Sequence, residues 1–361
     1  MEESKSTKAK INFKLDTILK ENKMPKYLLN VLSLFTILII TASNPTPASS
    51  GGCDHDARTQ VNATPLVTSD WVYNKIQSGE TNDNILLIDI RNSIGDGSYE
   101  TYLEGHIPTS IHSDYMKDGW RVKVDNTVGL VPTESQFQEL ARSLGVNSDT
   151  HVIIIPAGVS STDFGSAARS YWTFKVFGHE NVSILDGGYS AWENAYPSQI
   201  ATGAYDTIVE GNFIAKFNPE LYISTDDVAK IVDTKSDVIL LDGRPENQFY
   251  AEAKHGKARA AGRLPGSVLL FQENAYNVAE NTLKSEGELR EIFSDYIKDD
   301  VVSYCNTGHW AANNWFVLSE VLGNKNVKLY DGSMVEWTED PSRPLETSGP
   351  SNLDKLKGMI G

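Results

Sequence analysis

Cys305 stands where an apolar, β-prone run meets a helical pattern, and this placement could make its thiol a nucleophile. Residues 301–304 form the run, and the helical pattern begins at Ala311. The loop between them consists of Asn306, Thr307, Gly308, His309 and Trp310. Backbone N–H groups of such a loop and of the first helical turn have no intrahelical acceptor, so they would stabilise a thiolate, the form of cysteine that attacks. The alternative is a buried structural cysteine, which is common for a free thiol.

The composition restricts the chemistry that such a thiol could serve. The chain has 361 residues and a formal net charge of -16, which argues against a nucleic-acid partner because a phosphate backbone demands a basic surface. Its two cysteines, Cys53 and Cys305, cannot build a disulfide framework, and its seven histidines show no metal-ligand spacing. We therefore expect neither a metal nor a cofactor.

Residues 1–60 have the composition of an export signal or anchor followed by a linker. An apolar run at residues 28–42 fits a signal-peptide core and is short for a membrane span. Residues 50–52, before Cys53, resemble a bacterial lipoprotein cleavage box, although a serine stands where an aliphatic residue is usual. We expect an exported protein in the periplasm or cell envelope, with Cys53 a candidate for lipidation and the N-terminus a candidate for membrane attachment. An uncleaved anchor and a start at Met24 are alternatives.

The remainder of the chain contains an internal duplication. An apolar run leads into Asp89-x-Arg91 in the first half, and another leads into Asp242-x-Arg244 in the second. Further motif pairs follow in the same order: Gly105-His106-Ile107-Pro108 with Gly262-Arg263-Leu264-Pro265, and Asp186-Gly187 and Trp192 with Asp331-Gly332 and Trp337. Two copies of one domain are the architecture that this order indicates.

Each half alternates short, continuous apolar runs with helical patterns. The helical patterns lie at residues 135–145, 167–178, 225–232 and 311–323. Such alternation predicts an α/β fold in which each domain is a parallel sheet with helices on both faces. We place the domains at residues 65–200 and 220–347, with a linker at residues 201–219.

The two copies differ at the position that matters for chemistry. The apolar run at residues 152–155 matches 301–304, which places Pro156 opposite Cys305. The first-half loop, predicted at residues 156–165, would be longer and has no thiol. One copy therefore has a nucleophile and the other has none.

The ordered set of motifs resembles the tandem-domain sulfurtransferases of the rhodanese family, over residues 65–345. This family includes thiosulfate and 3-mercaptopyruvate sulfurtransferases. The resemblance implies two rhodanese-like domains, of which the first is catalytically silent and the second active, with the site in the cleft between them. It also implies that Cys305 takes a sulfane sulfur from a small anionic donor as a persulfide and passes it to cyanide or a thiol. Because neither domain holds a second cysteine, we expect an external acceptor.

The cysteine loop departs from both branches of the family. Thiosulfate-type loops usually carry basic residues after the cysteine, and mercaptopyruvate-type loops carry small ones that include a serine. Here only His309 could carry positive charge, and only in part at neutral pH. We expect His309 either to contact the substrate or to serve as a neutral donor packed against a neighbouring ring.

Two arginines are further candidates for substrate binding. By the resemblance, the basic connection at residues 254–263 borders the cleft and could steer a dianion such as thiosulfate, although a solvated surface loop is the alternative. We predict substrate contact for Arg263, which stands where the family more often has histidine. Arg244 matches the family's Asp-x-Arg arginine, for which structural pairing is the main expectation and anion contact the alternative. Gln248 replaces a second arginine of some thiosulfate enzymes, which weakens the thiosulfate assignment.

His106 matches a histidine that mercaptopyruvate enzymes use together with the loop serine and an aspartate. In this chain Thr307 could take the place of the serine, and Asp96 could orient the imidazole. The alternative is that His106 caps a turn.

Three other functions compete with sulfur transfer. A phosphatase of the Cys-x5-Arg type would lack its phosphate-binding arginine, because position 311 is alanine. A redox-sensing thiol would need a resolving cysteine, and only Cys53 is available. A non-catalytic sulfur carrier or interaction module remains open. We expect a thiosulfate sulfurtransferase (EC 2.8.1.-), with 3-mercaptopyruvate as the alternative donor, because a basic loop is present and the Cys-Gly-Ser pattern is absent.

Overall fold

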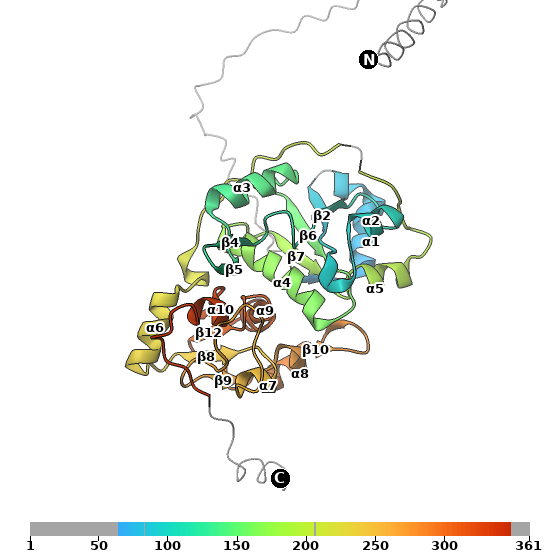
Figure 1. The fold of residues 1–361 in the computed structure, drawn as a ribbon. Coiled ribbons are helices and arrows are strands. Elements are labelled where there is room, and N and C mark those ends of the chain that lie inside the picture. Colours follow the sequence, from blue (N-terminus) through green and yellow to red (C-terminus); the bar gives the residue numbers. More distant parts are fainter. Residues whose placement is uncertain (1–63, 83, 206, 348–361) are drawn as a thin grey trace, which may run out of the picture. The chain divides into compact units, whose positions relative to one another are not determined.

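The computed structural model describes residues 64–82, 84–205 and 207–347 (Figure 1). The signal, anchor and lipidation predictions for residues 1–60 lie outside this part of the chain. Within it, no helix combines the length and the apolar character that crossing a membrane requires.

The first domain is built on a five-stranded parallel sheet. Its strands, in spatial order, are β1 (Leu66–Val67), β7 (Val182–Leu185), β6 (His151–Ile155), β2 (Ile85–Asp89) and β3 (Ile111–His112). Its helices are α1 (Ser69–Ser78), α2 (Tyr99–Glu104), α3 (Glu134–Ser143), α4 (Ser161–Val176) and α5 (Gly188–Ala195). An antiparallel hairpin, β4 (Val122–Val124) with β5 (Thr127–Leu130), precedes α3.

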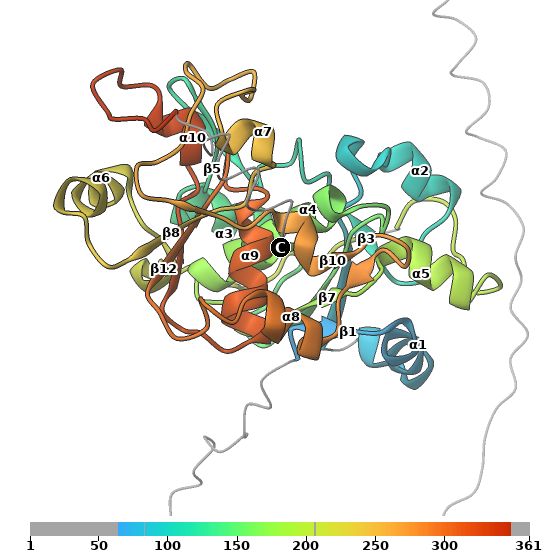
Figure 2. The same cartoon turned by 90° about the horizontal axis from the view of Figure 1, so that it is seen from below.

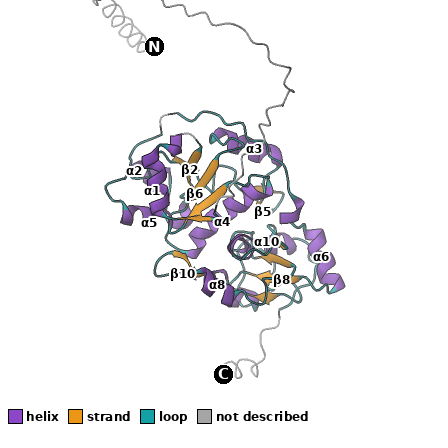
Figure 3. Cartoon of the chain, turned by 180° about the vertical axis from the view of Figure 1, so that it is seen from behind, coloured by secondary structure: helices purple, strands orange, loops and turns teal. Residues whose placement is uncertain are grey.

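Helices cover both faces of this sheet because successive strand side chains point to opposite faces. In β6, Val152 and Ile154 pack into a cluster with α3 and α4, whereas Ile153 and Ile155 pack into a second cluster with α1 and α5. Figure 3 shows these helices on the two sides of the sheet. The continuous apolar runs of the sequence are thus strands buried on both faces, as predicted.

The second domain repeats this plan on a smaller sheet. Its parallel strands, in spatial order, are β13 (Val327–Leu329), β12 (Val301–Tyr304), β8 (Ile239–Asp242) and β9 (Val268–Leu269). Its helices are α6 (Thr225–Thr234), α7 (Glu246–Phe249), α8 (Glu286–Ile292), α9 (Ala311–Phe316) and α10 (Ser333–Trp337). A small hairpin joins β10 (Tyr276–Asn277) to β11 (Thr282–Leu283). The predicted α/β class with two similar domains is confirmed.

Two local features differ from the prediction. The helix expected at residues 311–323 is α-helical only as far as Phe316, and it continues as a π-helical segment, Val317–Val321. The expectation of a longer loop at residues 156–165 is wrong, because α4 already begins at Ser161. Ser160 caps that helix by accepting the N–H of Asp163, which fixes its start five residues after Pro156.

The two domains share one hydrophobic core. Helix α4 of the first domain packs against α9 of the second (Figure 2). Phe164 and Tyr171 of α4 meet Phe316 of α9 edge to face, with ring centroids 5.8 and 4.9 Å apart. The helix that follows Cys305 is therefore anchored on the first domain.

Candidate active site

Cys305 directly follows β12, and one serine hydroxyl holds the loop that it opens. The N–H groups of Cys305 and Gly308 both donate to Ser333 Oγ, at 3.0 and 3.2 Å. Ser333 Oγ in turn donates to the carbonyl of Tyr330 at 2.7 Å. Gly308 has a φ of 69°, in the left-handed region that favours glycine, so the loop can turn back within four residues.

The loop presents amide donors that have no acceptor. The carbonyls of Cys305 and Asn306 accept the N–H groups of Met334 and Val335, at 3.1 and 3.0 Å. Since each peptide is planar and trans, the N–H groups that follow these carbonyls point the opposite way, away from α10. Among the described residues, no acceptor is found for the amides of Asn306, Thr307, His309, Trp310 and Ala311. These groups form what we call the amide cradle of Cys305, and they suit a negative charge on sulfur.

In the first domain, the amides of the equivalent loop bind a carboxylate. Its loop, residues 156–160, directs three amides onto the Asp163 carboxylate: Ala157 and Val159 at 3.3 and 3.4 Å and Gly158 at 2.7 Å. Asp163 is buried in the first turn of α4, where burial raises its pKa against the opposing effect of these amides. The first domain therefore fills its own cradle with a carboxylate.

The corresponding helix of the second domain leaves the cradle open. The third residue of α9 is Asn313 rather than an aspartate, and its side-chain amide donates to the Ser161 carbonyl and to Gln272. This side chain is committed to the joint between the domains. Nothing in the described part of the second domain takes the place of Asp163.

The Cys305 thiol is buried but lies at the joint between the domains. The residue is 1% exposed. Burial is the largest influence on the pKa values of Tyr115, Arg169 and Arg244, and the Cys305 thiol adds a smaller electrostatic contribution to each. Two of these groups belong to the first domain, so the sulfur faces charged and polar groups of both halves rather than a purely apolar interior.

His309 is a neutral group that joins the two domains. Its Nε2 lies 2.8 Å from the Thr162 carbonyl, which can only accept, so Nε2 carries the proton. Its Nδ1, 2.9 Å from the Tyr115 hydroxyl, then accepts that O–H. Burial, reinforced by the charge of Arg121, lowers the pKa of His309 to about 3. Of the two roles predicted for His309, this geometry favours the neutral one, packed beside the Tyr115 ring at 5.6 Å.

Replacing His309 by glutamine is expected to flatten the acid side of the stability profile. In the unfolded chain a histidine takes up a proton below about pH 6.5, whereas in the native state His309 stays neutral down to about pH 3. Wild-type stability should therefore fall as pH drops through this window, with a contribution from His309 of about 1.4 kcal/mol per pH unit. Urea unfolding between pH 7 and 4.5 measures both slopes, and equal slopes would contradict this assignment. The KM for an anionic donor should stay within about twofold at pH 7.

A buried ion pair from the first domain supports the cysteine loop. Arg169 of α4 and Asp331 lie 3.3 Å apart between Nη2 and Oδ2, with side chains 0% and 1% exposed. Arg169 also donates to the carbonyls of Gly129 and Thr307, at 3.1 and 3.4 Å. Asp331 accepts the N–H of Val131 at 2.6 Å. The first domain thus holds the cysteine loop of the second.

Arg244 forms the structural pair that the sequence predicts. Its Nη2 lies 2.7 Å from Asp242 Oδ2 and donates to the Gly262 carbonyl at 2.9 Å. The first domain repeats the arrangement with Arg91 and Asp89, which lie 2.9 Å apart. Because the pair is present in the domain without a nucleophile, it serves the fold of both copies, and anion contact by Arg244 gains no support.

Arg263 and its neighbours are largely occupied by other groups. Arg263 is 7% exposed, pairs with Glu346 at 2.5 Å and stacks on the Phe249 ring at 4.3 Å. Arg259 pairs with Glu339 at 2.5 Å, and Lys254 donates to the Ala258 carbonyl at 2.6 Å. Substrate contact by Arg263 therefore stays a prediction that its placement does not support.

His106 is placed as a turn residue. Its ring stacks on Tyr102 at 4.0 Å, and its Nδ1 donates to the Tyr102 carbonyl at 2.8 Å. Its backbone pairs with Ala201 of the linker. No hydrogen bond within the described chain joins His106 to Thr307 or Asp96, so the predicted relay is not assembled.

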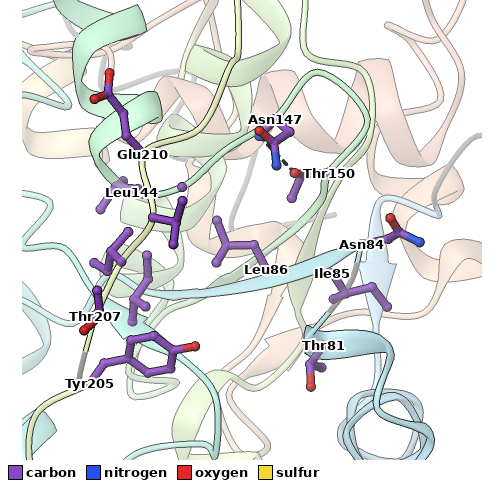
Figure 4. Close-up of a pocket in the computed structure, with 14 residues that line it drawn as sticks. Thr81, Asn84, Ile85, Leu86, Leu144, Asn147, Thr150, Tyr205, Thr207 and Glu210 are labelled. Carbon is purple, nitrogen blue, oxygen red and sulfur yellow. Dashed lines mark hydrogen bonds between the residues drawn. The ribbon is translucent and has the colours of Figure 1, made fainter.

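A separate cavity of about 320 Å³ lies in the first domain and is not part of this site. It is bounded by the start of β2, the end of α3 and the linker residues 207–210 (Figure 4). None of its lining residues belongs to the second domain.

Sequence reasoning missed the residues that the first domain contributes. Tyr115, Arg121 and Arg169 precede Cys305 by more than 130 positions, and no local pattern marks them. Asp331 was visible as part of a repeated Asp-Gly motif, which was the one available signal.

The fold and the site agree with comparisons to known proteins. The model of the rhodanese-like domain matches residues 68–195 and 224–340. The chain belongs to the rhodanese-like family and carries two copies of its domain. A 3-mercaptopyruvate sulfurtransferase of Escherichia coli K12 is 33% identical over 298 residues, which cover 79% of this chain and 99% of the relative. A Haloferax volcanii protein, provisionally named a thiosulfate sulfurtransferase, is 33% identical over 293 residues, covering 78% and 96%.

Solved structures show the same architecture. The crystal structure of SseA from Escherichia coli, described as a 3-mercaptopyruvate sulfotransferase, has a TM-score of 0.63 at 30% identity and covers 75% of this chain and 99% of its own. An anaerobic ergothioneine biosynthesis enzyme from Chlorobium limicola shares the fold at 24% identity, with a TM-score of 0.64 and coverage of 79% and 71%. This protein is a tandem-domain sulfurtransferase, as its motifs predict.

Proposed function

We propose that the protein transfers the sulfane sulfur of thiosulfate to cyanide or a thiol through a persulfide on Cys305. The observation that carries this proposal is the open amide cradle around Cys305, set beside the equivalent loop of the first domain, which binds a carboxylate. A loop of this geometry stabilises negative charge, and only the second copy offers it to an external anion.

The reaction proceeds by two displacements at sulfur. The Cys305 thiolate attacks the outer sulfur of thiosulfate, so a new S–S bond forms, the old one breaks, and its electron pair leaves with sulfite. Cyanide then attacks the terminal sulfur of the persulfide and departs as thiocyanate, which regenerates the thiolate. The cradle amides hold the charge on the terminal sulfur between the two steps.

The choice of thiosulfate over 3-mercaptopyruvate in this proposal is supported by the proton that the second donor requires. When mercaptopyruvate gives up its sulfur, the carbon it leaves must be protonated to yield pyruvate, whereas sulfite departs without a proton. Two nearby titratable groups already donate their protons elsewhere. His309 Nε2–H donates to the Thr162 carbonyl, and the Tyr115 hydroxyl, whose pKa is raised by burial, donates to His309 Nδ1. Thr307 is the loop residue whose hydroxyl remains available for the alternative donor.

A steady-state comparison of the two donors, with cyanide as acceptor, tests the proposal. We expect kcat/KM for thiosulfate to exceed that for 3-mercaptopyruvate by about tenfold or more. Mass spectrometry of donor-treated protein should show one added sulfur on Cys305. The reverse ratio would transfer the assignment to mercaptopyruvate. A persulfide without turnover would indicate a sulfur carrier, and the absence of both would indicate an interaction module.

Location in the periplasm or cell envelope is a further part of the proposal. It is supported by the apolar run at residues 28–42, which lies outside the described residues. N-terminal sequencing of the protein recovered from membrane and soluble fractions would reveal a cleaved, lipidated or retained leader, and recovery of the intact chain in the cytoplasm would contradict export.

A further inference from the structure

Arg121, directly before the β4–β5 hairpin, has a guanidinium group that meets no oxygen partner within residues 64–347 as far as they are described. Its Nη2 contacts the sulfur of Met116 at 2.9 Å, and its Nε is buried with no acceptor. Seven of the other described arginines pair with a carboxylate, and Arg142 donates to the Phe213 carbonyl at 2.7 Å. Among the described residues, the sulfur of Met116 is the one acceptor found for this half-buried arginine, which is unusual in a chain of net charge -16.

Three contacts place this guanidinium beside the cysteine loop. It lies 4.6 Å from the ring centre of Tyr115, whose hydroxyl bonds His309. A Cβ built on Gly129 would lie 2.9 Å from Thr307 Cβ and 3.6 Å from Arg121 Nη1, so the hairpin brings the cation against the loop. Hairpin strand β5 in turn packs on α10, the helix that backs the loop (Figure 1).

The charge of Arg121 also acts on two histidines of the second domain. Burial lowers the pKa values of His309 and His255. Arg121 lowers that of His309 further, and it adds a smaller effect to those of Lys254 and Lys257 at His255. His255 belongs to the basic connection at residues 254–263. Arg121 is therefore near enough to both that connection and the loop of Cys305 for its charge to act on them.

The surroundings of Arg121 hold the cation but do not neutralise it. Stacking on Tyr115 orients the planar guanidinium group and leaves its N–H donors available for hydrogen bonds. A buried N–H without an acceptor carries a free-energy cost that an arriving oxygen would remove. The forked donors of a guanidinium match two oxygens of a carboxylate or sulfonate, which is a geometry that lysine lacks.

We propose that Arg121 binds the oxyanion end of the sulfur donor. The first domain would then select donors that carry a negative charge. This inference rests on the proposed function. For thiosulfate, Arg121 would hold two oxygens of the sulfonate end while the outer sulfur meets Cys305, and it would stabilise the charge that collects on sulfite as the S–S bond breaks. The order of bond changes is that of the first displacement above, with no additional reactant.

Separate measurement of the two half-reactions tests the assignment. Loading is followed as persulfide formed from thiosulfate, and discharge as sulfide released from preloaded enzyme by dithiothreitol, a neutral dithiol that is oxidised to its disulfide. In Arg121→Gln we expect the second-order loading rate to fall about 10- to 100-fold, while discharge stays within about twofold. Arg121→Lys should recover part of the loading rate, since it restores the charge but not the fork.

Lys123 provides the matched control, because it is an exposed cation two residues along the same hairpin. Lys123→Gln should leave both half-reactions within about twofold of wild type. Unchanged loading in Arg121→Gln would overturn the assignment, and so would an equal fall in loading and discharge, which would show that Arg121 only shapes the loop. Failure of the wild type to load sulfur from any donor would instead remove the proposed function itself.

Discussion

Cys305→Ser is expected to reduce sulfur transfer from every donor by about 10⁴-fold or more, because the hydroxyl cannot supply an anionic nucleophile at neutral pH. The substitution should leave the fold intact. The loop is held through backbone groups of Cys305 and through Ser333, and serine preserves those contacts. The measurements are thiocyanate production with cyanide as acceptor and the mass of the donor-treated protein, which should show no added sulfur.

Pro156 supplies the internal control for this experiment. It occupies the position of Cys305 in the first domain, where Asp163 fills the cradle. Pro156→Ala should leave turnover within about twofold of wild type. Retained turnover in Cys305→Ser would contradict the assignment of the nucleophile, and loss of turnover in Pro156→Ala would contradict the assignment of the first domain as silent.

Arg169→Met is expected to destabilise the protein by about 3–5 kcal/mol, because it leaves the buried Asp331 carboxylate without its counter-charge. The carbonyls of Gly129 and Thr307 would also lose a donor. Since Asp331 supports Val131 on one side and adjoins Gly332 and Ser333 on the other, the cysteine loop should lose its order and activity should fall with stability.

The pH dependence of this effect has a defined sign. Burial already raises the pKa of Asp331, and Arg169 opposes that shift. Without Arg169 the native carboxyl should hold its proton to higher pH than the unfolded one, so the contribution of Asp331 to the stability of the variant should be most favourable at low pH and decline as pH rises. Urea unfolding at pH 5 and pH 8 should therefore show the larger deficit at pH 8.

Two further variants complete the test of the ion pair. Adding Asp331→Asn to Arg169→Met should recover part of the lost stability, since it removes the unpaired charge. Lys230→Met breaks an exposed pair with Asp227, 2.7 Å long, and should have no measurable effect on stability or turnover. If Arg169→Met were as mild as Lys230→Met, the buried pair would not hold the loop.

The sequence by itself determined the class of the protein and predicted the position of its nucleophile. Continuous apolar runs and helical patterns are local signals, so the two α/β domains could be predicted from the sequence. The duplicated Asp-x-Arg pairs could be found because they recur in the same order in both halves. The strand, loop and helix around Cys305 are consecutive in the chain, and the predicted amide donors follow from that order alone.

The tertiary structure decided which side chains serve the site. As a histidine, His309 could carry positive charge, but its burial between Thr162 and Tyr115 keeps the imidazole neutral. As an arginine, Arg263 could bind an anionic substrate, but its guanidinium already forms an ion pair with Glu346. Whether a side chain is free or committed depends on its partners, and no spacing rule reports them.

The dependence on distant partners also explains why the sequence did not reveal the residues that the first domain contributes to the site. Arg169 meets Asp331 across 162 positions, and Val131 meets the same carboxylate across 200. Such partners are chosen by the packing of α4 on α9, which brings the first domain onto the loop of the second. A local pattern records how a segment folds, whereas contacts between distant segments exist only once the whole core has formed.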